Sequence, residues 1–495
     1  MLFSSMIFLW AFLPIVIIVN SIIGILFSDG KKCIHAKNVF LLIASLIFYG
    51  FGGLNFLSIM IISIIINYIG GYLIASINVK EKSLRKIILT IVIALNLLML
   101  GYHKYFNMVV VIIERIIDKS TRGIEFWNEL LSMHGTGDLG LKEIILPIGI
   151  SFFTFQAMSY VIDVYRNDAV RQDNIFDFGL YVALFPQLIA GPIVKYSDVA
   201  NQINNRSENI KKFSKGVKRF CYGLGKKVII ANTFAEVVDK IWMLDLNNLG
   251  AVMTIIVMVS YGLQIYYDFS GYSDMAIGLG LMFGFEFKEN FNYPYMALSI
   301  TDFWRRWHIS LSTWFREYVY IPLGGNRKGL FRTCLNLLIV FMLTGIWHGA
   351  NFTFIIWGLV YAIILIIEKL FLLKVLKINK LKFLNWIYMI VITLVLFLVF
   401  RSNNIFEATT LINQLGTFES KYNFLTYVSM KFIVALIVGI LGMGIIQKIF
   451  GGIYSKIQNT AVAVTIDYIL QIGILIFSIL SIVDGTYNPF IYFQF

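Results

Sequence analysis

The chain has 495 residues, of which 58% are hydrophobic and only 14% carry a charge, whereas soluble domains carry roughly 25% charged residues. This composition excludes an ordinary soluble domain and predicts an all-α polytopic membrane protein. The net charge of +13 is explained by basic loops that fix membrane topology and contact lipid headgroups. No basic domain or recognition motif indicates a nucleic-acid partner.

Apolar segments long enough to cross a bilayer begin at the first residue. Residues 1–28 carry no charged side chain, and they lack a basic start and a small-residue cleavage site, so we expect a retained helix rather than a signal peptide. Residues 38–78, interrupted by glycines at 50–53, predict a helical hairpin. Residues 87–113 and 144–164 predict two further spans.

The middle of the chain is less regular. Residues 180–194 combine Pro186, Gly191 and Pro192 with an apolar run, which predicts a broken or re-entrant segment buried in protein, because unpaired backbone groups cannot face lipid. Residues 228–243 and 253–267 predict two spans. Residues 268–332 are the least membrane-like part of the second half.

Four apolar runs complete the chain: 335–369, 386–400, 432–446 and 462–483. The total is roughly eleven to thirteen membrane segments. No internal repeat and no soluble insertion is visible, so residues 1–495 are expected to form a single membrane-embedded domain.

The loops near the span ends predict the orientation. Basic residues cluster around Lys31, Lys82, Lys211, Arg327, Lys374 and Lys448, and positive loops remain in the cytoplasm. The loops 114–143 and 402–421 then lie outside, together with the N-terminus.

The five histidines of the chain are the first candidates for chemistry: His35, His103, His134, His308 and His348. An ionisable residue at membrane depth is costly and therefore indicates function. His348 follows Trp347 inside an uncharged run, residues 336–361. A structural role is equally consistent with this pattern, because Gly345 and Gly349 would permit a helix break at which a neutral histidine binds a carbonyl.

A second polar cluster spans residues 302–318. Asp302 and Arg306 are four residues apart and are expected to pair on one helix face. With Arg305, His308 and the neighbouring tryptophans, the segment predicts an amphipathic helix at the membrane interface. Its structural alternative is lipid anchoring alone.

Signatures of other chemistries are missing from the sequence. There is no GxSxG elbow, no phosphate loop and no HExxH motif. The three cysteines show no CxxC pairing, so we expect neither a disulfide framework nor a metal site. Gly271 and Gly278 fit helix packing better than nucleotide binding.

Ordered motifs along most of the chain resemble the membrane-bound O-acyltransferase family, in particular its alginate O-acetyltransferase branch. They are PIGISFFTF (147–155), FPQLIAGP (185–192), DFSGYSD (268–274), DFWRRWHISLS (302–312), YIPLGGNRK (320–328), WHG (347–349) and PFIYFQF (489–495). The resemblance implies re-entrant and interfacial helices around a central tunnel. It also implies a bacterial plasma-membrane location and transfer of an acyl group, acetyl in this branch, across the membrane.

The resemblance assigns the key histidine of the family to His348 and a second histidine to His308. It implies an acyl thioester donor, acetyl-CoA or an acyl carrier, as a substrate on the cytoplasmic side, with no permanently bound cofactor. It further implies an exported polysaccharide as acceptor and an extracytoplasmic acetyltransferase as partner.

Acyl transfer requires a base and an oxyanion stabiliser, which suggests roles for the polar residues. His348 would act as the base or as a transient acyl acceptor, because apolar surroundings favour a neutral ring. The remaining candidates would bind the donor or line the tunnel: Asp302, Arg305, Arg306, Trp347, Asn351, Gln264, Asp268 and Asp274. Asn351 would orient the His348 ring or donate to the oxyanion, and His308 would face the cytoplasm beside the arginines.

Two other functions remain open. The same fold would support D-alanyl transfer to teichoic acid. A transporter or flippase for lipid-linked sugar would instead require charged residues in several spans and would not depend on one histidine.

Overall fold

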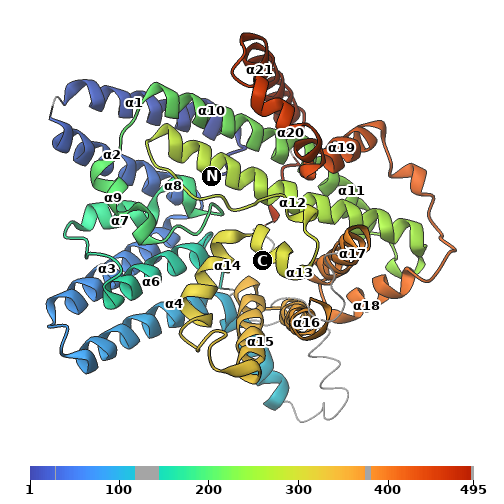
Figure 1. Cartoon of the computed structure of the whole chain (residues 1–495), viewed down its shortest axis with the longest axis horizontal. Helices are drawn as coiled ribbons and strands as arrows, with labels where there is room; N and C mark the ends of the chain where they lie inside the picture. The colour runs from blue at the N-terminus through green and yellow to red at the C-terminus, as the bar shows by residue number, and fades with distance from the viewer. Residues whose placement is uncertain (28, 118–143, 374–380, 486, 492–495) are drawn as a thin grey trace.

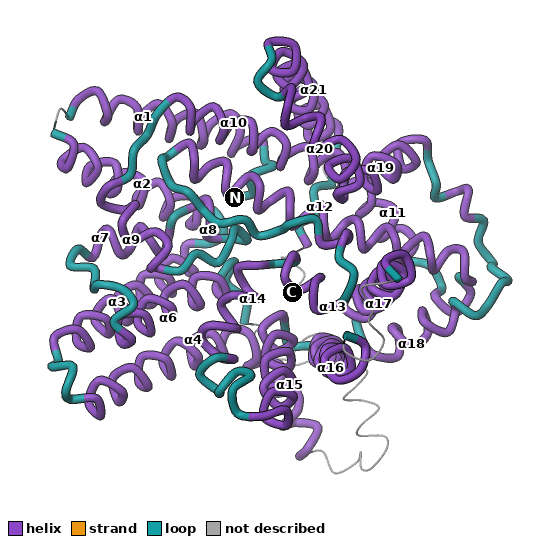
Figure 2. Tube along the Cα trace, viewed as in Figure 1, coloured by secondary structure: helices purple, strands orange, loops and turns teal. Residues whose placement is uncertain are grey.

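Helices make up all the regular structure that is described for this protein, which is analysed as a computed structural model (Figure 2). The structure describes residues 1–27, 29–117, 144–373, 381–485 and 487–491. The predicted outer loop 114–143, the basic loop around residue 374 and the end of the last motif lie largely outside these residues.

The first half of the chain forms α1 (Leu13–Leu26), α2 (Gly30–Gly50), α3 (Leu54–Ser76), α4 (Lys82–Ile117), α6 (Ile150–Arg166), α7 (Ile175–Ala183), α8 (Phe185–Leu188), α9 (Tyr196–Asn205), α10 (Ile210–Gly225) and α11 (Asn232–Trp242). The second half forms α12 (Gly250–Met282), α13 (Ile300–Arg306), α14 (Ile309–Phe315), α15 (Gly329–His348), α16 (Phe352–Ile367), α17 (Lys382–Arg401), α18 (Ile405–Gln414), α19 (Met430–Ile440), α20 (Ile446–Ile457) and α21 (Ala461–Asp484).

Ten of the helical stretches within the described residues are long and apolar enough to cross a membrane. They confirm a polytopic helical membrane protein. The larger predicted total included shorter segments, and two of these are helical: α6 has 17 residues and α11 has 11 residues. Both are shorter than the roughly 20 residues that span a bilayer.

The predicted break in residues 180–194 is confirmed. Helix α7 ends at Ala183, α8 is only four residues long, and residues 189–195 follow without a helix. All side chains from 180 to 194 are buried. Protein rather than lipid therefore surrounds this irregular backbone, as the cost of unpaired amides in hydrocarbon demands.

Helix α12 is the most deeply buried of the candidate spans and lies beside α10 and α11 in the middle of the molecule (Figure 1). Glycines allow the backbones of α10 and α12 to approach closely. A Cβ atom on Gly223 would lie 2.6 Å from the carbonyl oxygen of Gly271, and one on Gly216 would lie 2.5 Å from that of Gly278. Gly271 and Gly278 are therefore packing glycines, as the sequence indicated.

Basic residues next to two of the predicted cytoplasmic loops contact other parts of the chain. Lys37 of α2 pairs with Glu208 at 2.6 Å, and Arg85 of α4 donates to the carbonyls of Val164 and Tyr165 at the end of α6. The predicted outer segment instead meets the start of α12, where the Ala251 amide donates to the Thr417 carbonyl at 2.6 Å. The orientation across the membrane stays a prediction.

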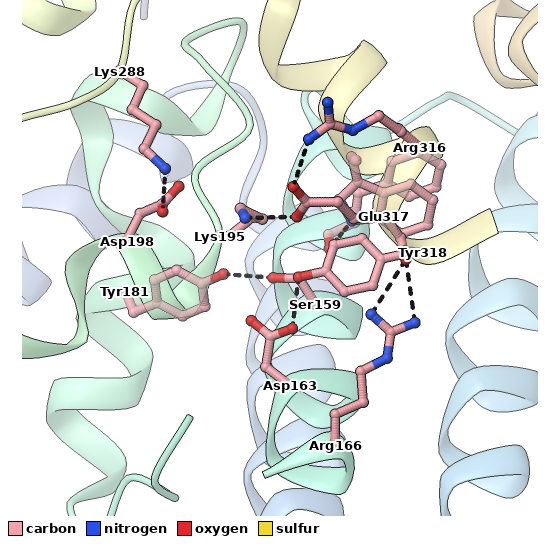
Figure 3. A network of polar contacts seen from close by, with 12 residues as sticks. Ser159, Asp163, Arg166, Tyr181, Lys195, Asp198, Lys288, Arg316, Glu317 and Tyr318 are labelled. Carbon is pink, nitrogen blue, oxygen red and sulfur yellow. Dashed lines mark hydrogen bonds and ion pairs between the residues drawn. The ribbon is translucent and has the colours of Figure 1, made fainter. Parts of the chain in front are cut away.

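A polar network joins the chain after α14 to α6 on the predicted cytoplasmic side (Figure 3). The Tyr318 hydroxyl donates to Asp163 at 2.7 Å, and Lys195 pairs with Glu317 at 2.7 Å. Arg166 donates twice to the Glu317 carbonyl at 3.2 Å. Burial acts to raise the pKa of Glu317, but the Lys195 ammonium outweighs it and holds this pKa below its usual value, so the pair persists at neutral pH.

The C-terminal segment is held in the interior by a buried ion pair. Lys227 lies 2.8 Å from Asp268, and both side chains are 2% exposed. Lys227 also donates to the Pro489 carbonyl, while Asp268 accepts the Ile491 amide at 2.8 Å. The pair therefore positions the final described residues against α12.

Replacing Lys227 with alanine is expected to leave the Asp268 carboxylate buried without its ammonium partner. Breaking a buried pair from one side costs about 3–5 kcal/mol, so the thermal midpoint of the detergent-solubilised protein should fall clearly. Lys240→Ala is the control, because Lys240 and Glu236 form an exposed pair, 60% and 46% accessible, and exposed pairs contribute about 0–1 kcal/mol. Equal midpoint shifts in the two variants would contradict this account.

Candidate active site

His348 is the last residue of α15, and the chain resumes a helix only at Phe352. The two helices pack closely at this point, because a Cβ atom on Gly345 would lie 2.3 Å from the Phe354 carbonyl oxygen. The predicted helix break is confirmed at residues 349–351. It places the His348 side chain at the end of a helix, beside non-helical backbone.

Aromatic rings surround His348. Its ring centroid lies 5.0 Å from those of Trp347 and Phe400 and 5.3 Å from that of Trp357. The side chain is buried, and Nδ1 has no hydrogen-bond partner among the described residues. The alternative of a structural histidine bonded to a carbonyl therefore finds no support in this geometry.

His308 occupies a strained turn between α13 and α14. Its φ of 43° lies in the left-handed region, which costs roughly 1–2 kcal/mol for a residue with a Cβ atom. Asn290 stabilises this turn: its carbonyl oxygen accepts the Ile309 amide at 2.9 Å, and its Oδ1 accepts the Ser310 amide at 3.1 Å.

The same asparagine defines the tautomer of His308. Because Oδ1 of Asn290 is an acceptor, His308 Nδ1, 3.3 Å away, must carry the hydrogen. Nε2 is then the ring acceptor, and it is buried without a partner among the described residues. Burial lowers the pKa of His308 to about 3, so the ring is neutral at physiological pH.

A small cavity of about 20 Å³ is lined by both histidines. Its other walls are apolar, from Ile265, Phe269, Trp307, Trp357, Phe397, Phe400 and Ile491. The space is comparable to that needed by a single water molecule. The structure therefore brings together the two histidines that the sequence singled out, 40 residues apart in the chain.

A larger cavity, of about 320 Å³, is also lined by His348. Its other walls come from Trp347, Lys104 and the segment from Leu146 to Phe152. Helix α4 runs toward the predicted outer side at this point, and the space is therefore called the outward cavity below. His348 lines both this cavity and the small one.

A third cavity, of about 490 Å³, lies on the predicted cytoplasmic side. Its walls include three basic side chains, Arg305, Arg316 and Lys369, together with apolar residues of α15 and α16. Its lining reaches Thr344, one turn before His348. Three cavities therefore lie at or near His348 within the described part of the chain, and the central tunnel stays a prediction.

The second predicted cluster needs two corrections. Residues 302–318 do not form one interfacial helix, because α13 ends before His308 and α14 begins after it. The side chains of Trp304, Trp307 and Trp314 are buried in the protein rather than anchored in lipid. His308 does not lie beside Arg305 in the cytoplasmic-side cavity. The prediction assumed an ideal helix in which His308 and Arg305 share a face. The left-handed backbone at His308 ends that helix, and the His308 side chain is buried instead.

The predicted pairing of Asp302 with Arg306 is confirmed at 3.0 Å. Neither residue lines the cytoplasmic-side cavity, whereas the neighbouring Arg305 does. Of the three predicted donor-binding residues in this helix, the structure therefore places only Arg305 at a space large enough for a ligand.

Three of the four other candidates are engaged in capping or ion pairs. Asn351 caps α16 by accepting the Thr353 amide at 3.0 Å and donates to the Asn403 carbonyl at 2.7 Å, so it does not orient His348. Asp268 pairs with Lys227, and Asp274 pairs with two basic residues of the α10 region, Arg219 and Lys226. Neither aspartate lines the three cavities, and neither does Gln264.

Two charged residues in apolar runs were not predicted from the sequence to have a role. Lys104 lies within a candidate span and lines the outward cavity with His348. Glu368 is fully buried and accepts hydrogen bonds from the amides of Ile300 and Thr301 at 2.6 and 2.8 Å. A charge inside a predicted span was the signal available for both.

The fold and the two facing histidines define a polytopic helical enzyme, and comparison with known proteins gives its class. The model of the membrane-bound O-acyltransferase family matches residues 150–406, more than half of the chain. The chain belongs to this family and is an O-acyltransferase.

Three relatives show the range of this similarity. The chain is 38% identical to the probable alginate O-acetylase AlgI of Pseudomonas putida over the whole of both chains. It is 35% identical to the peptidoglycan O-acetyltransferase of Helicobacter pylori, over 74% of this chain and 70% of that protein. A teichoic acid D-alanyltransferase of Streptococcus thermophilus is 29% identical over 49% of this chain and 61% of that protein.

Glu368 is expected to hold the helix that carries Arg305. Its carboxylate satisfies two amides at the start of α13, and leaving such donors buried without partners costs about 1–3 kcal/mol each. Glu368→Ala should therefore speed hydrogen exchange of residues 300–306, whereas Glu368→Gln, which keeps an acceptor oxygen, should do so less. Unchanged exchange in the alanine variant would contradict this role, and Glu236→Ala, at an exposed pair, is the control.

Proposed function

We propose that this protein transfers an acetyl group from a cytoplasmic thioester donor across the plasma membrane of a bacterium, for O-acetylation of an exported polysaccharide. The alginate and peptidoglycan relatives named above support this substrate class, because both act on carbohydrate polymers. The observation that carries the proposal is that His348, whose Nδ1 has no partner among the described residues, lines both the outward cavity and the small cavity that it shares with His308.

His348 is the proposed base. Its neutral ring removes the proton from a hydroxyl group, whose oxygen adds to the acyl carbonyl carbon while the carbonyl electrons move onto oxygen. Collapse of this intermediate breaks the carbon–sulfur bond, and the departing thiolate takes the proton from His348. A transient acyl group on His348 itself is the alternative route, with the same groups entering and leaving.

The basic cavity on the predicted cytoplasmic side is the proposed donor site. Arg305 and Arg316 present guanidinium groups there, and such groups bind phosphate through paired hydrogen bonds. Acetyl-CoA and the prosthetic group of an acyl carrier both combine phosphate with a thioester. Both therefore fit a cavity with a basic rim and an apolar wall directed toward His348.

The acceptor side requires an aqueous route to the outward cavity. We infer that the hydroxyl group arrives there either from the polysaccharide itself or from an extracytoplasmic acetyltransferase that passes the acetyl group on. Membrane lipids complete the surroundings of the ten candidate spans.

D-alanyl transfer to teichoic acid is the second candidate, supported by the more distant Streptococcus thermophilus relative. That relative covers only about half of this chain, whereas the alginate relative covers all of it. The two functions differ in the group transferred. Mass spectrometry of cell-surface glycans with and without the protein separates them, since acetyl and alanyl esters differ in mass.

Replacing His348 with alanine should abolish acetylation of the surface polysaccharide in a strain whose only copy is the variant. A positioned base contributes roughly 10²- to 10⁴-fold, so residual ester should fall to background. Ester-bound acetate released by mild alkali is the measurement, with immunoblotting of the membrane fraction to confirm that the variant inserts.

His35→Ala is the matched control, because His35 is exposed near the start of α2 and lines none of the three cavities. Wild-type ester in this control and none in His348→Ala is the expected result. Normal acetylation by an inserted His348→Ala protein would exclude His348 as base and as acyl acceptor.

Arg305→Ala should weaken donor binding. Loss of one charge-assisted hydrogen bond costs about 1.5–3 kcal/mol, which corresponds to a rise of roughly 10- to 150-fold in the Kd for acetyl-CoA. Equilibrium binding of radiolabelled acetyl-CoA to the purified protein provides the measurement. Arg306→Ala is the control, because Arg306 pairs with Asp302 outside the cavity, and equal losses in the two variants would exclude this donor site.

A further inference from the structure

Lys104 is a charged residue inside a candidate span that the proposed function has not yet used. It lies on α4 and faces the outward cavity, which it lines together with His348 and Ser151. A cation at membrane depth is expensive. The Lys104 amine beside His348 therefore indicates a function that offsets this cost.

The contacts of Lys104 leave part of its hydrogen-bonding capacity unused. Its Nζ donates to the Trp347 carbonyl and lies 3.4 Å from the Ser151 hydroxyl and 5.7 Å from the centre of the Trp347 ring. An ammonium group has three donors, so one remains for a group in the cavity. Within the described part of the chain, no carboxylate pairs with Lys104.

Helix capping explains only part of this arrangement. The last carbonyls of α15 have no partner within their own helix, and Tyr105 donates to that of Ile346 while Lys104 donates to that of Trp347. A cation near a helix C-terminus is favourable. A second hydroxyl would satisfy the Trp347 carbonyl as well, however, and would not bring a positive charge to the wall of the cavity.

We propose that Lys104 is a catalytic residue whose ammonium stabilises the negatively charged oxygen formed during acyl transfer at His348. This inference rests on the proposed function. When the acceptor hydroxyl adds to the acyl carbon, its proton passes to His348 and the carbonyl electron pair moves onto oxygen. Lys104 donates its remaining N–H to that oxygen. When the intermediate collapses, the electron pair on oxygen re-forms the carbonyl double bond, the carbon–sulfur bond breaks, and the departing thiolate takes the proton from His348.

Electrostatics favours this role over a purely structural one. A donor directed to the place where charge develops acts most strongly where water is excluded, and the aromatic walls around His348 provide such surroundings. Removing one oxyanion donor typically lowers kcat by roughly 10²- to 10³-fold. The outward cavity contains no other charged side chain among the described residues that line it.

The competing role for Lys104 is to bind an anionic group of the acceptor. The two roles differ in the kinetic constant that they affect. An oxyanion donor affects kcat with every acceptor, whereas an acceptor-binding cation affects KM and only with acceptors that carry an anion.

The experiment compares Lys104→Gln, Lys104→Arg and Lys104→Ala with the wild type as purified proteins in lipid nanodiscs, in which both faces of the bilayer are open to radiolabelled acetyl-CoA and to the acceptor. Two tetrasaccharides are the acceptor probes, one with a carboxylate on each ring and one neutral, and turnover is counted as released CoA thiol, with water as acceptor when no sugar is added. His348→Ala in the same preparation reports on the proposed function separately.

The expected result is a fall in kcat of roughly 10²- to 10³-fold in Lys104→Gln, equal for both sugars and for water, with KM and acetyl-CoA binding unchanged. Lys104→Arg should retain more activity than Lys104→Gln. Added ethylammonium should restore part of the rate of Lys104→Ala.

Three outcomes would overturn the inference. One is a rise in KM confined to the carboxylated sugar. Another is loss of acetyl-CoA binding and thermal stability in Lys104→Gln without rescue of Lys104→Ala by ethylammonium. The third is a normal kcat in Lys104→Gln. If the wild type transfers acetyl to neither sugar, the proposed acceptor fails, whereas the comparison of thiol release still decides the role of Lys104.

Discussion

The end of α15 imposes the constraint on which the rest of the site depends. A helix that ends in the interior of a protein leaves carbonyl groups that its own backbone cannot satisfy. Here Tyr105 and Lys104 of α4 reach the carbonyls of Ile346 and Trp347. This solution fixes the position of α4 relative to α15, and it brings an amine to the cavity that His348 lines.

A second constraint comes from the strained turn at His308. Asn290 stabilises the left-handed backbone by accepting hydrogen bonds from the amides of the next two residues, Ile309 and Ser310. The same asparagine oxygen leaves His308 Nε2 as the acceptor, directed away from that contact. Asn290 therefore determines both the backbone geometry and the tautomer of His308. The result is a neutral second histidine beside the small cavity that His348 also lines.

The sequence predicted the features that depend on local pattern. Apolar length identified the spans, the prolines around 186–192 identified the buried break, and the glycines near His348 identified the end of α15. It failed where tertiary contacts decide: residues 302–318 have the spacing of one helix, and only the bonds to Asn290 explain the break at His308. Lys104 and Glu368 were visible as charges in apolar runs, but nothing local shows that one lines a cavity and the other caps a helix.

Polarity inside an apolar segment is therefore a weak guide to function by itself. Asn351 and Asp274 looked functional in the sequence, yet their side chains are engaged in capping and ion pairs. Gln264 keeps a carbonyl oxygen without a partner among the described residues, but it lines none of the three cavities. His308, His348 and Lys104 combine both conditions, a polar group with remaining hydrogen-bonding capacity and a space beside it for a substrate. Since a reacting group needs both, this pair of conditions separates the three residues from the many buried polar groups that only hold the bundle together.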